Sequence, residues 1–489
     1  MKNEKAQSIW QVIFASSAGT LIEWYDFYIF GSLATVISSK FFPDSNPGIA
    51  YIATLATFAV GFIVRPFGAI VFGRLGDITG RKHTFLLTLL IMGGCTFAIG
   101  LVPSYQTIGV FAPIIVLILR LLQGLALGGE YGGAATYVAE HAPYHQRGYY
   151  TSFIQTTATL GLFISLAVVL ATRTSMTPEN FNAWGWRIPF WLSVFLVIMS
   201  YYIRIRLKES PLFTQLKATG QTSKNPIKES FGKKENLKLV LLALFGAAMG
   251  QGVVWYTGQF YALSFLQKTM QIEFVQSNVI IAVALILGTP FFIYFGKLSD
   301  KIGRKKIMLS GMLIAAICYY PIYAGMDRIA DLSRKTEDTS LYKIENSISN
   351  NNKTQTVERT YTDGTVARDI TKSVNEKQVS TVKEVVVSPV NVALLVLLVF
   401  IQVIFVTMVY GPIAAFLVEL FPTRIRYTSM SLPYHIGNGV FGGLLPTIST
   451  ILVTNTGNHL AGLIYPIAVA LICFVIGVVY IKDYMINKD

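Results

Sequence analysis

The sequence predicts an all-α membrane protein: twelve transmembrane helices in two pseudo-symmetric six-helix bundles, with a small β-rich segment outside the membrane. Its composition is the first observation that predicts this class. Of the 489 residues, 53% are hydrophobic and 13% are charged, whereas about 25% of the residues of a soluble domain are charged. An internal repeat of a loop motif is the second, because it divides the chain into two similar halves. A soluble globular protein is therefore excluded.

The apolar runs are long enough to cross a membrane as helices. A transmembrane helix needs about 20 mostly apolar residues, and these runs are continuous rather than alternating, which excludes a β-barrel. The three cysteines lie inside such runs, so we expect neither a disulfide nor a metal site. The predicted spans are 10–38, 49–73, 84–103, 108–139, 150–172, 184–204, 238–266, 276–297, 307–326, 389–417, 427–453 and 460–482.

Lysine and arginine residues in the short loops predict the orientation. Cytoplasmic loops carry an excess of both, and here they cluster at 74–82, 204–238 and 297–306. Both termini are expected on this side of the inner membrane. The net charge of +14 thus indicates orientation, not nucleic-acid binding. The first apolar run is too long for a signal peptide, so we expect it to remain as a helix.

One polar segment, 327–388, interrupts the second half. It contains ten acidic and ten basic residues, and long loops are exempt from the charge rule, so we expect it outside the cell membrane. Alternation at Thr354–Tyr361 and Thr365–Thr371 around Asp363-Gly364 predicts a hairpin, and Gln378–Val387 a third strand. We expect a decoration without transport chemistry; regulation or partner binding is the alternative. The remaining predicted domains are a first bundle (1–205), a cytoplasmic linker (206–237) and a second bundle (238–489).

A repeat relates the two halves. Gly73–Lys82 (GRLGDITGRK) follows the second span, and Gly296–Lys305 (GKLSDKIGRK) follows the eighth, 223 residues later. Glu140, Pro143 and Arg147 match Glu419, Pro422 and Arg426 with an offset of 279. The larger offset is explained by the 327–388 insertion. Parallel six-helix repeats are typical of a transporter with its site between the halves.

These loops resemble the signature of the major facilitator superfamily. Five further stretches together resemble its metabolite:proton symporter branch, whose members carry 2-oxoglutarate, citrate, shikimate, proline or betaine. The resemblance covers the chain except the insert and implies a secondary transporter without a cofactor, not an enzyme. The five stretches are Glu23–Tyr28, Arg65–Gly68, Gln123–Tyr131, Gly185–Phe190 and Glu419–Arg424, and Arg120–Gly124 resembles the fourth-helix motif.

Ionisable side chains at mid-membrane are costly and are therefore functional candidates. Glu23 and Asp26 share one face of the first helix, and Arg120 reaches the same depth on the fourth. We expect Asp26 to be the leading proton site, Glu23 the second, and Arg120 the cation that pairs with the deprotonated carboxylate. The resemblance to sugar/proton symporters implies the same arrangement. A static ion pair between the helices is the alternative.

Other charged residues suggest packing and gating. Glu130 is expected to form a network with Arg65, either structural or proton-coupling. In the repeated loops, Asp77 and Arg81, and likewise Asp300 and Arg304, are predicted to latch the cytoplasmic gate through charge-assisted bonds or a helix N-terminus. Lys82 and Lys306 are expected only to enforce topology.

Polar and aromatic residues inside apolar helices are candidates for contacts with substrate. Trp255 and His435 are among them, and a lone histidine such as His435 is more often a packing residue. The residues expected to line a substrate cavity are Tyr28, Arg120, Gln155, Gln251, Tyr256 and Asn438.

The sequence predicts proton-coupled symport of a small polar metabolite by a monomer in the lipid bilayer. An organic acid is preferred because Arg120 can pair with its carboxylate. The alternatives are a proton-independent facilitator or exchanger, and a betaine- or proline-type zwitterion held on Tyr28 and Trp255 by cation–π contact. A transport-fold sensor is a weaker alternative, because no large cytoplasmic output domain is predicted. The related osmosensory betaine and proline carriers bear a C-terminal coiled coil, and since none is predicted here, an osmotic sensor of that type is disfavoured.

Overall fold

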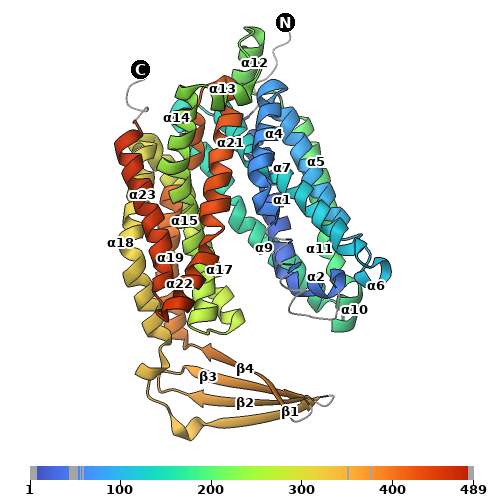
Figure 1. Cartoon of the computed structure of the whole chain (residues 1–489), viewed down its shortest axis with the longest axis vertical. Helices are drawn as coiled ribbons and strands as arrows, with labels where there is room; N and C mark the ends of the chain where they lie inside the picture. The colour runs from blue at the N-terminus through green and yellow to red at the C-terminus, as the bar shows by residue number, and fades with distance from the viewer. Residues whose placement is uncertain are drawn as a thin grey trace.

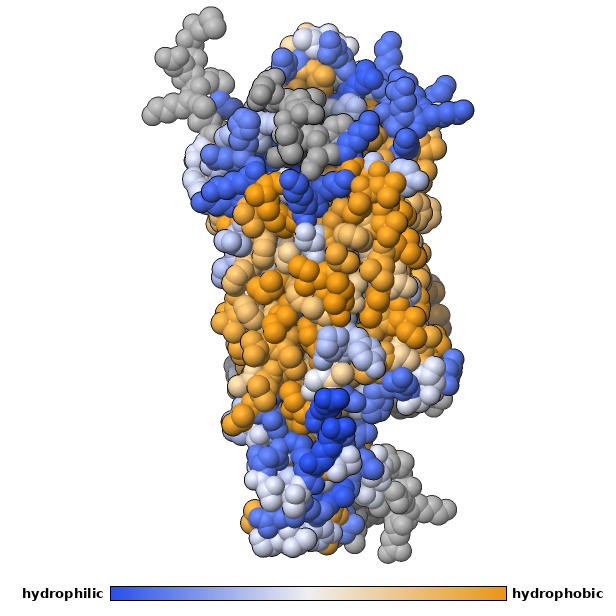
Figure 2. Space-filling model, turned by 90° about the vertical axis from the view of Figure 1, so that its left-hand side faces the viewer, coloured by the Kyte–Doolittle hydropathy of each residue, from blue (hydrophilic) through white to orange (hydrophobic). Residues whose placement is uncertain are grey.

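Long apolar helices make up most of the chain. The computed structural model describes residues 8–42, 53–54, 57, 60–349, 352–374 and 377–482. Ten helical runs within these residues are long and apolar enough to cross a membrane, and Figure 2 shows the apolar belt that they form between two hydrophilic ends. The runs are Arg81–Ile99, Phe111–His141, Tyr144–Thr174, Gly185–Ile205, Lys234–Thr269, Phe274–Ile302, Arg304–Ala330, Pro389–Leu420, Thr423–Thr456 and Ala461–Tyr480.

The helices of the first 205 residues lie together on one side of the molecule (Figure 1). The predicted span 10–38 is divided at Leu33 into two helices. Of the predicted span 49–73, residues 49–52, 55–56 and 58–59 lie outside the described residues. The helices are α1 (Ile9–Ser32), α2 (Ala34–Phe41), α4 (Arg65–Ile78), α5 (Arg81–Ile99), α6 (Tyr105–Ile108), α7 (Phe111–His141), α8 (Arg147–Gln155), α9 (Thr157–Thr174), α10 (Pro178–Ala183) and α11 (Ile188–Ile205).

The later helices form the other side, and α12 (Pro211–Ala218) and α13 (Pro226–Gly232) connect the two at one end (Figure 1). The run Lys234–Thr269 is not a uniform α-helix, because π-helical turns interrupt it at Leu244–Ala248, Thr257–Tyr261 and Phe265–Thr269. The other elements are α14 (Lys234–Ala243), α15 (Met249–Tyr256), α16 (Ala262–Ser264), α17 (Phe274–Ile302), α18 (Arg304–Ala330), α19 (Pro389–Tyr410), α20 (Ile413–Leu420), α21 (Arg426–Ile436), the π-turn η9 (Gly437–Gly442), α22 (Leu445–Thr456) and α23 (Ile464–Tyr480).

Glycines allow α4 and α7 to approach closely. A Cβ on Gly128 would lie 2.2 Å from the carbonyl oxygen of Arg65, and one on Gly68 would lie 2.0 Å from that of Leu125. Small residues at helix contacts let backbones pack directly in membrane proteins. Two of the stretches singled out in the sequence, Arg65–Gly68 and Gln123–Tyr131, are thus the two sides of one helix–helix contact.

The insert is a four-stranded antiparallel meander at the opposite end from α12 and α13 (Figure 1). The predicted hairpin and third strand are confirmed as β2, β3 and β4, with Thr360 paired to Val366 next to the turn. An additional edge strand, β1, precedes them, and α18 continues to Ala330, beyond the predicted end of its span. The strands are β1 (Lys343–Ser349), β2 (Asn352–Thr360), β3 (Val366–Val374) and β4 (Lys377–Val386).

The sheet is tied to the loop before α17. Val385 donates its backbone N–H to the carbonyl of Gln271 (2.8 Å), and Glu273 donates to the carbonyl of Val385 (3.0 Å). The side-chain amide of Gln276 exchanges two hydrogen bonds with the backbone of Val387 (2.8 and 2.9 Å). At the base of the sheet, partial burial alone would raise the pKa of Asp363, but hydrogen bonds from Lys335 and Thr365 lower it to about 2. The Asp363 carboxylate therefore stays charged at neutral pH.

Replacing Gln276 with leucine should loosen this attachment without unfolding the helices. Two hydrogen bonds to Val387 are lost, each contributing about 0.5–1.5 kcal/mol net. Amide hydrogen exchange across 385–387 should then accelerate roughly 5- to 100-fold, since about 1.4 kcal/mol corresponds to a factor of ten. Asn278→Leu is the control, because the amide of Asn278 bonds within α17. Equal exchange in both variants would show that Gln276 does not anchor the sheet.

Candidate functional site

A small cavity lies between the two groups of helices, near the middle of their length. Its free volume is about 30 Å³. Both halves of the chain contribute to it: α1 and residues 62–65 from the first, and α15, α19, α21 and η9 from the second. The lining residues of this central cavity are Glu23, Trp24, Phe62, Arg65, Trp255, Tyr256, Tyr410, Tyr434, His435, Asn438 and Gly439.

Several polar groups around the central cavity are incompletely satisfied. Glu23 and Arg65 form a loose ion pair of 3.9 Å. Arg65 Nε, Trp255 Nε1 and His435 Nε2 are buried without a hydrogen-bond partner in the described chain. A buried unpaired polar group costs about 1–3 kcal/mol, so a ligand that supplies partners is favoured here.

Aromatic rings form the rest of the wall. The rings of Trp24 and Trp255 lie 5.2 Å apart, one from each half, and Trp255 lies 6.1 Å from Tyr410. The hydroxyls of Tyr410 and Tyr434 are hydrogen-bonded at 2.6 Å. The faces of several such rings attract a cation through their quadrupoles. The central cavity therefore combines one carboxylate, one guanidinium and an aromatic wall.

Asp26 and Arg120 lie on a second cavity of about 20 Å³, which Glu23, Arg65 and Gln123 also line. This volume is enough for one water. The Thr96 hydroxyl donates to Asp26 Oδ2 (2.5 Å) and accepts from Gln123 Nε2 (2.6 Å), and Arg120 donates to Gln123 Oε1 (2.6 Å). Gln123 and Thr96 thus link the guanidinium to the carboxylate by hydrogen bonds, and the expected pairing of Arg120 with deprotonated Asp26 stays a prediction.

Glu130 has a different partner from the one expected. It pairs with Arg204 at 2.6 Å and accepts a bond from the Thr88 hydroxyl at 2.8 Å, whereas Arg65 pairs with Glu23. Arg204 also donates to the carbonyls of two other helices, and both members of the pair are buried. No direct ion pair joins Glu130 to Arg65 within the described residues, and the wider network expected for Glu130 stays a prediction. The sequence interpretation assigned Arg204 to the basic cytoplasmic cluster and so missed the Glu130–Arg204 pair.

The predicted substrate residues do not all line one cavity. Tyr256 and Asn438 line the central cavity, and Gln251 supports Asn438 through two amide–amide hydrogen bonds of 3.1 and 2.9 Å. Gln155 instead donates to the hydroxyl of Tyr131. Tyr28 lines a larger cleft of about 310 Å³, which also includes Phe27, Phe260 and the start of α17 near the sheet.

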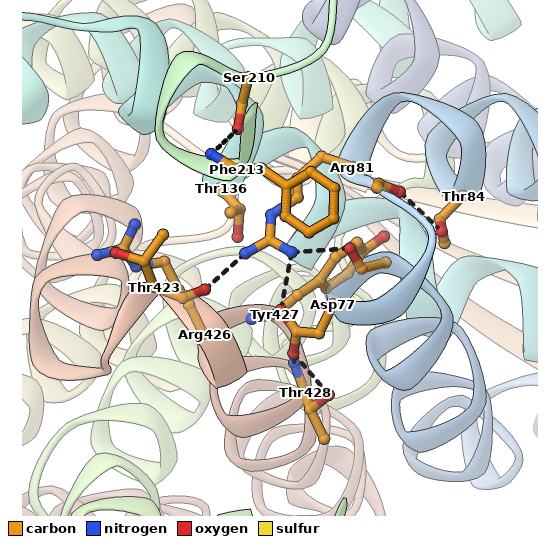
Figure 3. A network of polar contacts seen from close by, with 12 residues as sticks. Asp77, Arg81, Thr84, Thr136, Ser210, Phe213, Thr423, Arg426, Tyr427 and Thr428 are labelled. Atoms are coloured by element: carbon orange, nitrogen blue, oxygen red, sulfur yellow. Dashed lines mark hydrogen bonds and ion pairs between the residues drawn. The ribbon is translucent and has the colours of Figure 1, made fainter. Parts of the chain in front are cut away.

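The loop motif of the first half latches onto the second half. Asp77, near the end of α4, accepts hydrogen bonds from Tyr427 N (3.3 Å), Thr428 N (2.8 Å) and Thr428 Oγ1 (2.7 Å) at the start of α21 (Figure 3). Arg81 pairs with Asp77 at 2.9 Å and donates to the carbonyl of Thr423. A carboxylate at a helix N-terminus is stabilised by the unpaired N–H groups and the helix dipole.

The second-half motif makes the equivalent contact with the first half. Asp300 on α17 accepts from Gly148 N (2.9 Å) and Tyr149 N (2.8 Å) at the start of α8. Arg304 pairs with Asp300 and with Glu419 (2.5 and 3.0 Å). Two carboxylates, one from each half, thus cap a helix of the opposite half. The end of the molecule that carries α12 and α13 is closed by these two latches, while the cleft beside Tyr28 lies toward the sheet.

Comparisons with known proteins show that the chain is similar to membrane transporters in sequence and in fold. The family model "Sugar (and other) transporter" matches residues 11–339. The proline/betaine transporter of Escherichia coli (strain K12) is 30% identical over 477 residues, covering 96% of this chain and 82% of that protein. The inner membrane metabolite transport protein YhjE of the same organism is 31% identical over 458 residues, covering 93% and 90%. The structure of the proton:xylose symporter XylE superposes with a TM-score of 0.71 at 17% identity over 97% of this chain and 96% of that one.

Proposed function

Because the chain belongs to the sugar (and other) transporter family of the major facilitator superfamily and is a multi-pass membrane transporter, not an enzyme, we propose that it couples import of a small metabolite to proton entry. The proposed mechanism is alternating access, in which the two halves rock about the central cavity. The observation that carries this proposal is the central cavity itself, built from both halves and closed at one end by paired latches.

We infer twelve spans in two pseudo-symmetric six-helix bundles, 1–205 and 238–489, with 206–237 as the cytoplasmic linker. The sequence spans 10–38 and 49–73 would add two to the ten apolar runs. The basic end with α12 and α13 would be cytoplasmic, and 327–388 would be extracytoplasmic. This orientation is supported by the sheet and the linker lying at opposite ends (Figure 1), and makes the latched conformation outward-facing.

Asp26 is the proposed proton carrier. It is 3% exposed and accepts a hydrogen bond from the Thr96 hydroxyl. Its Oδ1 atom is buried without a described partner, so a proton or a water can occupy that position. Gln123 and Thr96 link Arg120 to Asp26 by hydrogen bonds, and a small shift of α1 against α7 can therefore change the stability of the charged carboxylate. Glu23, paired with Arg65, is the second candidate.

A zwitterion fits the central cavity better than an organic acid. The organic-acid expectation depended on Arg120, but Arg65, not Arg120, lines the central cavity. Arg65 and the Trp255 N–H are suited to a substrate carboxylate, while Glu23 and the aromatic wall are suited to a cationic group. The similarity to proline/betaine transporters supports the same choice. The cavity of about 30 Å³ has to widen to admit such a molecule.

Asp26→Asn should abolish proton-driven accumulation while sparing exchange. Asparagine keeps the shape but cannot release a proton, so uphill uptake driven by an imposed pH gradient should fall to background in proteoliposomes. The measurement is uptake of radiolabelled proline and glycine betaine, with citrate and 2-oxoglutarate as competitors. Asp331→Asn, an exposed acid of the insert, is the control.

Two outcomes would contradict this scheme. Retained uphill uptake by Asp26→Asn would remove Asp26 from proton coupling, and uptake independent of the pH gradient in the unmodified protein would favour a facilitator or exchanger. Competition by citrate but not by betaine would restore the organic-acid alternative.

A further inference from the structure

The repeat that relates the two latches is broken at one position. Glu140 pairs with Arg81 (3.5 Å) from its own half and with Arg426 (2.9 Å) from the other half. Its counterpart Glu419 likewise pairs with Arg304 of its own half. The counterpart of Arg426 is Arg147, yet no ion pair joins Arg147 to an acid within the described residues. The Glu140–Arg426 ion pair, which joins the two halves, therefore has no counterpart between Glu419 and Arg147.

A pocket lies where that missing pair would be. Its volume is about 460 Å³, larger than the central cavity. Arg147 and Arg426 lie on its wall and are only 9% and 6% exposed. It is built from the start of α8, the middle of α14, the end of α20 and the loop between α20 and α21. The lining residues of this arginine pocket are Tyr144, Arg147, Leu239, Glu419, Leu420, Phe421, Pro422, Thr423 and Arg426.

The two guanidinium groups have donors to spare. Arg147 Nε donates to the carbonyl of Ala139 (3.0 Å), and Arg426 uses Nε and one terminal nitrogen for the carbonyl of Phe421 and for Glu140 (3.3 and 2.9 Å). A guanidinium carries five donors, so each keeps further N–H groups for a ligand on the pocket side. Bringing two arginines to one pocket without a shared acid is unfavourable unless an anion joins them.

Glu419, the acidic residue that lines the arginine pocket, does not bridge the two arginines. Glu419 accepts bonds to both carboxylate oxygens from Arg304 (3.3 and 3.0 Å). Because Glu140 balances Arg426 and Arg304 binds Glu419, Arg147 is the guanidinium of the arginine pocket without an acidic partner within the described residues, and the hydroxyls of Tyr144 and Thr423 also line the pocket. Paired guanidiniums with hydroxyl donors are the arrangement that recognises a tetrahedral oxyanion bidentately.

We propose that the arginine pocket binds a phosphate-class oxyanion, either free phosphate or the headgroup of an anionic phospholipid, between Arg147 and Arg426. The bound anion connects Arg147 to Arg426, at the position where the repeat lacks an ion pair between the halves. Arg147 belongs to the first half and Arg426 to the second, so the bound anion holds the latched end closed. This proposal does not depend on the identity of the transported substrate.

Thermal unfolding of the purified full-length protein tests the site. Inorganic phosphate, titrated against chloride at constant ionic strength, should raise the unfolding temperature of the unmodified protein. In Arg147→Gln the apparent affinity for phosphate should fall at least tenfold. Arg424→Gln is the matched control, because Arg424 lies in the loop between α20 and α21 that lines the pocket, is half-exposed and pairs with Glu229 outside the pocket. It should respond as the unmodified protein does.

A second measurement separates the two sources of the anion and guards against a folding defect. Lipid nanodiscs containing phosphatidylglycerol are compared with nanodiscs of phosphatidylcholine, with Arg147→Lys as the milder variant. Stabilisation by phosphatidylglycerol alone assigns the headgroup, and stabilisation by phosphate assigns the free ion. In both cases amide exchange at the start of α21, 427–430, should slow when the anion binds. Absence of protection by either anion, or an unchanged response in Arg147→Gln and Arg147→Lys, overturns the proposal.

Discussion

Replacing Glu130 with leucine is expected to destabilise the protein by about 3–5 kcal/mol, the range for breaking a buried pair by removing one partner. Arg204 would keep its carbonyl contacts to Ala15 and Phe85 but lose the carboxylate that balances its charge. Both side chains are almost fully buried, so water cannot replace the missing partner. Unfolding monitored in mild detergent should show a large fall in transition temperature, or the variant should fail to accumulate in the membrane.

The double variant Glu130→Leu/Arg204→Leu is the informative control. Replacing a whole buried pair by apolar residues is often neutral or stabilising, so the double variant should recover most of the lost stability. Recovery of stability together with retained pH-driven uptake would assign Glu130 a packing role and remove it from the proton-coupling candidates. A single variant as stable as the unmodified protein would contradict the assignment of this pair as structural.

The sequence was informative where a single helix or loop decides the outcome. The apolar runs predicted the long helices, because hydrophobic length is a property of one segment. The hairpin around Asp363-Gly364 was predicted for the same reason, since its turn chemistry is local. The edge strand β1 was missed, because Lys343–Ser349 lacks strong alternation and becomes a strand only by pairing with β2.

Residues whose partners lie on distant helices were harder to place. The pairing of Asp26 with Arg120 was predicted from depth and from the resemblance to sugar/proton symporters, and neither shows that Gln123 and Thr96 link the two residues. Arg204 was taken as a topology signal, although its side chain reaches into the helix core. Arg65 was visible as an intramembrane charge, but its place beside the central cavity depends on the rotation of its helix, which hydropathy does not determine.

The two loop motifs are equivalent in chemistry as well as in sequence. Asp77 caps α21 and Asp300 caps α8, each aspartate being held by an arginine four residues later. Each latch crosses from one half to the other, so both must break before this end can open. In each motif the helix that carries the aspartate ends before the arginine, and the turn at Gly80 (φ 124°) or Gly303 (φ 102°) brings the two side chains together. The aspartate meets the opposing helix while the arginine holds it in position.

Asp77→Asn should therefore open the latched end. Asparagine retains one acceptor oxygen but loses the charge that the three donors of α21 and Arg81 recognise, and charge-assisted bonds contribute about 1.5–3 kcal/mol each. A net loss of about 3 kcal/mol would shift the conformational equilibrium roughly 100-fold toward states open at this end. The readout is the labelling rate of Thr136→Cys, a buried position in contact with Met430 of the other half, in a background without the three native cysteines.

The two latches also predict how the variants combine. Asp300→Asn should raise the labelling rate in the same direction, and because the caps act on different helices, the double variant should exceed either single one. Asp327→Asn, at the sheet end of α18 and paired with His459, should leave the rate unchanged. If Thr136→Cys is labelled no faster with Asp77→Asn than with Asp77 unchanged, the contact between Asp77 and α21 does not control access to this end of the molecule. The closed end must then depend on packing, such as the stacking of Tyr131 on Tyr434 at 3.7 Å.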